Sequence, residues 1–349
     1  MKTKLTLRRI AAQAQTLRPS WASSLLPVMR KAMAAVLDGA VAPSADEVRE
    51  AIAAAYGRYG ARIAPTDVRL GIDAARLVAA ASADNIVAVM DPGGLYELGV
   101  HIGDGRGADI DQGFYRGVEY LSEFDEAGFR VPLPIHEPQL AQLAAAQGVT
   151  GVAMSAREQL QWVRYAQQTG MTILHDATAG AFVTSAPATL LATEGAATCV
   201  LETVSAASCG LAGAVYSIVP AAWQADLGTL RDVPMAEALG HYLVEPELSP
   251  LLAAGLVARY SERGEEEWAA RRCAWQRLTA DVRALLDTLG SEYWGAREIP
   301  VIWTDQRSAA VLAAAYPAAV LHDGAAFGPA GAAHVRVDVS GVIRTDKGE

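Results

Sequence analysis

QLQWVRYAQQTG (159–170) and MTILHDA (171–177) begin the stretch that decides the fold, and TCVLET (198–203), SAASCGLAG (205–213) and AVYSIVP (214–220) complete it. The first segment has a helical pattern. The second, third and last are short apolar runs bounded by Gly, Asp or Ser, which is typical of strands. Buried apolar strands that alternate with helices suit a parallel sheet. The stretch therefore predicts an α/β fold.

Composition limits the classes of protein to which the chain can belong. It has 349 residues, 52% of them hydrophobic, and a net charge of -10, which favours a globular protein and disfavours nucleic-acid or anionic-membrane partners. No apolar run approaches the roughly eighteen residues of a membrane span. Three scattered cysteines (Cys199, Cys209 and Cys273) suit a reducing cytoplasm, and no His or Cys spacing indicates a metal site.

The N-terminal segment has a charge of its own. The first 37 residues contain seven basic groups and no acidic one, whereas the other 312 carry 22 basic and 39 acidic groups, a net -17. An Arg-rich, acid-poor start is typical of a transit peptide. The alternative is an arm that docks on an acidic surface of its own or a partner subunit. We favour the arm because a helical pattern follows directly.

Other segments predict further helices and strands. Ser44 with Glu47 three residues later is a capping box that begins a helix. Two long helical patterns flank Gly264, and an Ala- and Leu-rich segment at 137–147 predicts a helix. Strands are predicted at 68–72, 86–90 and 129–134, and in the tail at 299–304, 318–323 and 334–340.

The central segments resemble the fold type I pyridoxal-phosphate transferases, and most closely the LL-diaminopimelate aminotransferase branch of the class I/II aminotransferases. HDATA (175–179) matches the family's Tyr-Asp-x-x-Tyr segment, so the resemblance assigns Asp176 to the pyridine nitrogen of the cofactor. ETVSAAS (202–208) matches a segment that ends in the Schiff-base lysine, but the lysine position holds Ser208. Ser205 stands where that family has a phosphate-binding serine. Gly148 stands near the position of its cofactor-binding Asn.

Two more segments carry the resemblance. GAAFGPAG (324–331) followed by HVRV (334–337) looks like the family's Gly-x-x-Phe-Gly-x-x-Gly and its substrate-carboxylate arginine, which would be Arg336. DPGGLY (91–96) looks like a strand end that contributes a tyrosine to the site, which would be Tyr96.

The resemblance covers about residues 24 to 341 and implies a fold and an assembly. It implies a mostly parallel sheet sandwiched by helices in a large domain at 43–235. A smaller α+β C-terminal domain at 236–349 and an N-terminal arm and helix at 1–42 complete the fold. Members of this fold build their sites between two subunits, so a homodimer is implied.

The distribution of lysines bears on the cofactor. The chain has four lysines (Lys2, Lys4, Lys31 and Lys347), and it has no Lys or Arg between Arg164 and Arg231. A Schiff base needs a primary amine, and a phosphate is held by cations or helix-terminal amides. We therefore expect no cofactor, with non-covalent binding of pyridoxal or pyridoxamine phosphate as the remaining alternative.

Each candidate site residue has a structural alternative. Asp176 binds a ligand or caps the turn after its strand. His175 points to the opposite face of the sheet by strand alternation, and a structural role is favoured over a catalytic one. Ser208, like Cys209, is a candidate nucleophile or part of a closely packed turn. Arg336 lies on an apolar strand and must pair with an anion, either a ligand carboxylate or Asp338.

Three functions remain open from the sequence. The first is a repurposed protein that binds an amino-acid-like or other small carboxylate ligand through Arg336, with cofactor-free chemistry in a biosynthetic pathway. The second is a non-catalytic subunit or scaffold that pairs with an active aminotransferase. The third is an aminotransferase-like enzyme that holds pyridoxamine phosphate non-covalently.

Overall fold

The computed structural model describes residues 25–72, 87–90, 108–109, 114–115, 118–125, 128–184, 188–206, 210–211, 213–220, 245–295 and 297–340. Three candidate site residues, Tyr96, Ser208 and Cys209, lie outside these residues. Among the helices of the described residues, none is long and apolar enough to cross a membrane.

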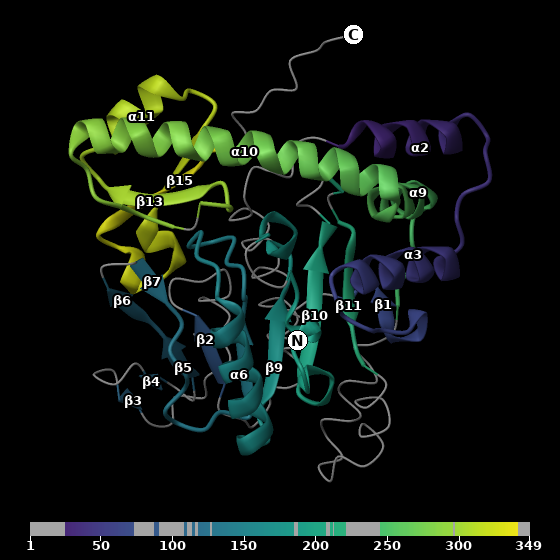
Figure 1. The fold of residues 1–349 in the computed structure, drawn as a ribbon, viewed down its shortest axis with the longest axis horizontal. Coiled ribbons are helices and arrows are strands. Elements are labelled where there is room, and N and C mark those ends of the chain that lie inside the picture. The colour runs from purple at the N-terminus through teal and green to yellow at the C-terminus, as the bar shows by residue number, and fades with distance from the viewer. Residues whose placement is uncertain are drawn as a thin grey trace, which may run out of the picture.

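Most of the described strands form one large sheet (Figure 1). Its five central strands, β10, β9, β8, β2 and β5, run parallel, and the flanking pairs are antiparallel. The predicted α/β fold with a parallel core is therefore confirmed. The strand order is β1 (Val68–Leu70), β11 (Val215–Ile218), β10 (Val200–Ser205), β9 (Thr172–Asp176), β8 (Leu140–Leu143), β2 (Val87–Met90), β5 (Val118–Leu121), β4 (Phe114–Tyr115) and β3 (Ala108–Asp109).

A second sheet is built from the C-terminal part of the chain. Its order is β12 (Tyr293–Trp294), β13 (Val301–Asp305), β15 (His334–Asp338) and β14 (Val320–Asp323), all antiparallel. A short hairpin of β6 (Glu123–Asp125) and β7 (Gly128–Arg130) packs beside it through Phe124, Phe129 and Trp294. The three tail strands predicted from the sequence are present.

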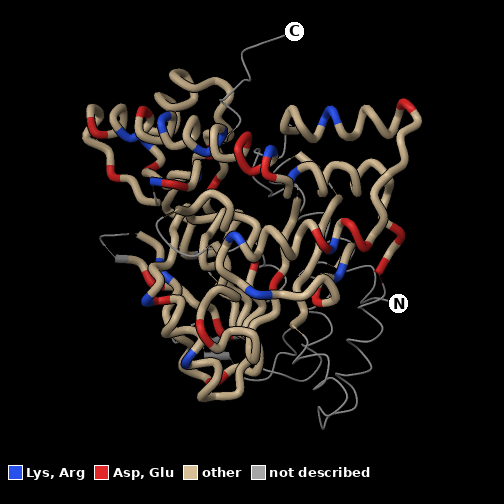
Figure 2. The backbone as a smooth tube through the Cα atoms, turned by 45° about the vertical axis from the view of Figure 1, so that its right-hand side comes forward, with Lys and Arg blue, Asp and Glu red and all other residues tan. Residues whose placement is uncertain are grey.

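Helices cover both sheets. They are α2 (Pro27–Leu37), α3 (Ala45–Arg58), α6 (Ala156–Thr169), α9 (Pro250–Tyr260), α10 (Glu262–Leu289) and α11 (Ala309–Ala315). The long helix α10 runs from the α2–α9 end of the molecule to α11 beside the second sheet (Figure 1). Acidic and basic residues are interspersed along it (Figure 2). The predicted capping box is formed, because Ser44 Oγ accepts from the Glu47 amide at 3.2 Å.

The helix predicted at 137–147 is wrong, because residues 140–143 form β8. All four of its residues are buried, between β2 and β9. A strand covered on both faces shows no alternation of polar and apolar residues, so an Ala- and Leu-rich run looks helical in sequence. Pairing with two parallel neighbours overrides that local preference for a helix.

The break between α9 and α10 lies at Ser261 rather than at Gly264. Ser261 is the N-cap of α10, and its hydroxyl accepts from the Gly264 amide at 3.1 Å. Gly264 lies inside the first turn of α10, against the end of α9. A Cβ there would approach the carbonyl oxygens of Ala258 and Arg259 at 2.2 and 2.3 Å. The glycine is therefore required by close packing and not by a turn.

We expect Gly264→Ala to destabilise the protein by about 1–3 kcal/mol, because backbone atoms must move to admit the methyl group. Gly57→Ala in α3 is the matched control, since a Cβ at Gly57 meets nothing within 4 Å. Alanine is the better helix former, so the control should stabilise by roughly 0.5–1 kcal/mol. Urea unfolding measures both changes. Two stabilising substitutions would show that Gly264 is not crowded.

Aromatic side chains pack α10 against the short turn that follows β9. Phe182 packs against Trp268 and Trp275 with ring centroids 5.2 and 5.1 Å away. The Trp268 indole donates to the Ala181 carbonyl at 2.9 Å. Ala181 and Phe182 belong to the short 3-10 turn η4 (Gly180–Phe182), which follows β9. The chain after β9 is thereby held against the middle of α10.

Candidate functional site

The carboxyl ends of β9 and β10 lie side by side, where open α/β sheets commonly bind ligands. Asp176 at the end of β9 is in register with Thr203 of β10. Its Oδ1 accepts from the Thr178 amide at 2.9 Å, and the Thr178 hydroxyl accepts from the Ser205 amide at 2.9 Å. Asp176 therefore does cap the turn, as one of its two alternatives states. Its side chain is still half-buried and not enclosed.

A tight turn follows β8, the strand that pairs with β9 in the large sheet. The Gly151 amide donates to the Gln147 carbonyl at 2.8 Å, and Gly151 has a φ of 72°. A Cβ on Gly151 would approach the Val301 carbonyl oxygen at 2.5 Å, so the turn packs directly on β13.

Arg336 of β15 binds this turn. Its Nε donates to the Val149 carbonyl and its Nη2 to the Gly148 carbonyl, each at 2.9 Å. Asp338 lies 3.7 Å from Nη2, and the guanidinium lies over the Phe327 ring at 5.3 Å. The side chain is 0% exposed. The structure supports both alternatives for Arg336. The pairing with Asp338 is formed. Its Nη1 has no hydrogen-bond partner among the described residues, which leaves a donor for a ligand carboxylate.

Burial dominates the electrostatics of Arg336. Removal from water lowers the pKa of its guanidinium, and the nearby Asp338 carboxylate opposes that change. Asp338 is itself bound by the Ser340 amide at 2.9 Å and by the Ser340 hydroxyl at 2.5 Å. The arginine and its carboxylate thus form a fully buried polar pair inside the second sheet.

His175 points to the opposite face of the large sheet from Asp176, as alternation predicts. It is buried, and its Nδ1 lies 2.8 Å from Oε2 of Glu202 on β10. The hydroxyls of Tyr56 and Thr189 donate to the same carboxylate. The geometry favours the structural role for His175.

Glu202 organises a buried polar cluster for which no motif was recognised in the sequence. Burial, followed by the Glu202 charge, raises the pKa of Tyr56 well above its ordinary value. A cavity of about 30 Å³ adjoins the cluster. Tyr216 and Tyr260 line it too, with hydroxyls 2.5 Å apart. Glu202 is the one acidic residue in the buried strand VLETVS (200–205), and an acid in such a strand indicates a buried polar cluster.

The remaining predicted residues divide between the described and undescribed parts of the chain. Ser205 ends β10 half-buried, with its amide bound by Thr178. Ser208 and Tyr96 lie outside the described residues, and so does Cys209. Cys199 is buried, and burial raises the pKa of its thiol to about 11, so it is protonated and unreactive at neutral pH.

No family model matches the chain. The LL-diaminopimelate aminotransferase of Prochlorococcus marinus strain MIT 9313 is 28% identical over 240 residues, which is 66% of this chain and 59% of that protein. Over this region the chain is similar to the LL-diaminopimelate aminotransferases. Its matched region spans about 59% of the length of this relative.

Solved structures confirm the fold of the type I pyridoxal-phosphate aminotransferases. L,L-diaminopimelate aminotransferase from Chlamydomonas reinhardtii superposes with a TM-score of 0.73 at 22% identity, covering 96% of this chain and 90% of that one. A PLP-bound C-S lyase from Staphylococcus hominis superposes with a TM-score of 0.67 at 13% identity, covering 90% and 80%.

These comparisons overturn the expectation that the chain takes no cofactor. The relatives are aminotransferases, and the lyase is PLP-bound, so they point to pyridoxal-phosphate binding. The expectation rested on the positions of the four lysines and on the absence of Lys or Arg between Arg164 and Arg231. Neither observation bears on the carboxylate of Asp176 at the end of β9.

Among the described residues, the Asp176 carboxylate is the group that suits an atom of the cofactor, its pyridine nitrogen. Asp176 presents a half-buried carboxylate at a strand end, oriented by the Thr178 amide, which suits a protonated pyridine nitrogen. Lys31 is the single lysine in the described part of the chain, and it lies in α2. The described residues at the ends of β9 and β10 therefore include no amine for a covalent link.

Proposed function

We propose that this chain binds pyridoxal phosphate, or its amine form pyridoxamine phosphate, non-covalently, together with an amino-acid-like carboxylate ligand. Homology to the LL-diaminopimelate aminotransferases supports the class of cofactor. The observation that carries the proposal is the fixed and still accessible carboxylate of Asp176 at the end of a central parallel strand. When bound, the cofactor supplies a ring that withdraws electrons from an attached substrate.

Asp176 has the role of holding a proton on the cofactor's ring nitrogen. One of its oxygens is occupied by the Thr178 amide, which fixes the plane of the carboxylate. The other oxygen accepts no hydrogen bond from the described residues. A charge-assisted hydrogen bond to that oxygen is stronger than one between neutral groups.

Arg336 has the role of positioning the ligand carboxylate. The carbonyls of Gly148 and Val149 occupy Nη2 and Nε and so set the direction of the guanidinium plane. Its Nη1 is the remaining donor without a partner among the described residues. Ser208 offers no amine, so the cofactor must be retained by contacts such as the Asp176 pair and by neighbouring hydroxyls, among them Ser205.

Binding of pyridoxal phosphate and pyridoxamine phosphate by calorimetry tests this proposal. We expect both to bind, and we expect Asp176→Asn to weaken binding about tenfold or more, because the charge-assisted bond is worth roughly 1.5–3 kcal/mol. Asp38→Asn, at the exposed end of α2, is the control and should leave affinity unchanged. Thermal melts show whether the Asp176→Asn variant keeps its fold.

Borohydride treatment of the pyridoxal phosphate complex separates the modes of binding. We expect no pyridoxyl group on any peptide, neither from residues 150–330 nor from those that hold Lys2, Lys4, Lys31 and Lys347, which carry the side-chain amines of the chain. A stoichiometric reduced adduct on any of them would contradict non-covalent binding. Absence of binding by either form of the cofactor would contradict the proposal and leave the scaffold hypothesis, in which the chain pairs with an active aminotransferase.

A further inference from the structure

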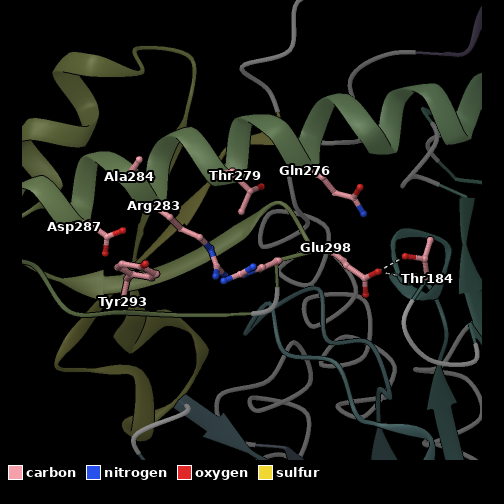
Figure 3. A pocket seen from close by; sticks show the side chains of 10 residues that line it. Thr184, Gln276, Thr279, Arg283, Ala284, Asp287, Tyr293 and Glu298 are labelled. Atoms are coloured by element: carbon pink, nitrogen blue, oxygen red, sulfur yellow. Dashed lines mark hydrogen bonds between the residues drawn. The ribbon is translucent and has the colours of Figure 1, made fainter.

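A second cavity, of about 550 Å³, lies away from the strand ends, between α10 and the start of the second sheet. Neither Asp176 nor Arg336 lines it. Figure 3 shows Arg283 pointing from α10 into this space, with Asp287 and Tyr293 toward one end and Gln276 and Thr184 toward the other. Its volume is in the range of small-molecule sites.

Two arginines line this cavity. Arg283 comes from α10 and Arg297 from the segment between β12 and β13. Burial is the main cause of a lowered pKa for Arg283; Tyr293 and the Asp287 carboxylate oppose it, and the positive charge of Arg297 adds to it. Like charges repel each other, and an anion between them removes that repulsion. An oxyanion between the two guanidiniums would therefore be favourable.

Neither guanidinium is neutralised by a salt bridge to another residue that the structure describes. Arg283 donates through Nη2 to the Gly295 carbonyl, while its buried Nε has no hydrogen-bond partner among those residues. Arg297 is exposed. A buried N–H without an acceptor costs about 1–3 kcal/mol, which an incoming acceptor would recover.

The carboxylates of the cavity are already engaged. Glu298 accepts from the Thr184 amide at 2.9 Å and from the Thr184 hydroxyl, shown as dashed lines in Figure 3. Asp287 also lines the cavity, beside Tyr293. The Thr279 hydroxyl donates to the Trp275 carbonyl at 2.8 Å, so the donors that the cavity presents come from its two arginines.

We propose that this cavity binds a small oxyanion, carboxylate or phosphate, between Arg283 and Arg297. The planar fork of arginine matches both kinds of oxyanion. The site joins three parts of the chain: Thr184 after η4, the middle of α10, and the segment that leads into β13. A bound oxyanion therefore links α10 to the segment after η4 and to the segment that leads into β13. This site and its role are independent of the cofactor proposed above.

Thermal melts with inorganic phosphate and with citrate test the proposal, using sodium chloride at the same ionic strength as the reference. Because a ligand that binds only the folded state stabilises it, we expect a saturable rise in melting temperature. The more effective of the two salts identifies phosphate or carboxylate as the preferred group. Arg297→Gln should weaken the apparent affinity about tenfold or more.

Arg277→Gln is the matched control, because Arg277 is exposed on the same helix and does not line the cavity. It removes the same charge and should leave the response to phosphate and citrate unchanged. An equal loss in both variants would mean general charge screening and overturn the site, as would a wild-type response no greater than that to chloride. Asp176→Asn should keep the response, so a failure of the cofactor proposal is recognised separately.

Discussion

Replacing Glu202 with leucine is expected to destabilise the protein by about 3–5 kcal/mol, one of the two largest effects of any substitution we consider. The carboxylate is 0% exposed and accepts from three groups: His175, Tyr56 and Thr189. Leucine has a similar volume but no acceptor. It would leave the buried donors of His175, Tyr56 and Thr189 without this acceptor, and each such loss costs about 1–3 kcal/mol.

Glu202→Gln should cost less, about 1–2 kcal/mol. Its amide oxygen can take the place of Oε2 beside His175 and Thr189, and its NH2 can donate to the Tyr56 hydroxyl oxygen. Charge is lost while the number of hydrogen bonds is kept. The difference between the leucine and glutamine variants therefore measures the hydrogen-bonded network and not the volume of the side chain.

Urea unfolding of the two variants measures these changes, with Glu50→Leu as the control. Glu50 is exposed on α3, so its replacement should change stability by less than about 0.5 kcal/mol. A Glu202→Leu protein as stable as the control would show that the cluster contributes nothing to folding. His175 would then be free for the catalytic role that the sequence left open.

The strands around the candidate site could be predicted because their sequence pattern is local. Asp176 ends a five-residue strand, and alternation alone places His175 on the opposite face. The strand at 140–143 could not be predicted in this way, since its four residues are buried on both faces and resemble a helix in composition.

The partners of the site residues could not be predicted, because they lie far away in sequence. Arg336 contacts the turn at Gly148 and Val149, which lies 187 to 188 positions earlier in the chain. Resemblance to a known family identified the arginine, but only the fold shows that two backbone carbonyls hold it. The cavity between Arg283 and Arg297 was missed for the same reason, since no motif connects a helix residue to a loop after the next strand.

Arg336→Met is expected to destabilise the protein by about 3–5 kcal/mol, because breaking a buried pair leaves an uncompensated charge. Methionine keeps an unbranched apolar side chain over Phe327 but removes every donor. Asp338 and the carbonyls of Gly148 and Val149 would all lose a partner. Arg164→Met, on the exposed face of α6, is the control and should fall within about 0.5 kcal/mol of the wild type.

A double-mutant cycle with Asp338→Asn separates the ion pair from the other contacts. If the carboxylate and the guanidinium compensate each other, the double variant should be more stable than the sum of the single changes predicts, by about 0.5–3 kcal/mol. Additive changes would show that the carbonyl contacts alone hold Arg336, since its nearest approach to Asp338 is 3.7 Å.

The ligand role of Arg336 is tested with the same proteins. Amino and keto acids that raise the melting temperature of the wild type should fail to do so for Arg336→Met. A full ligand response in that variant would confine Arg336 to the fold.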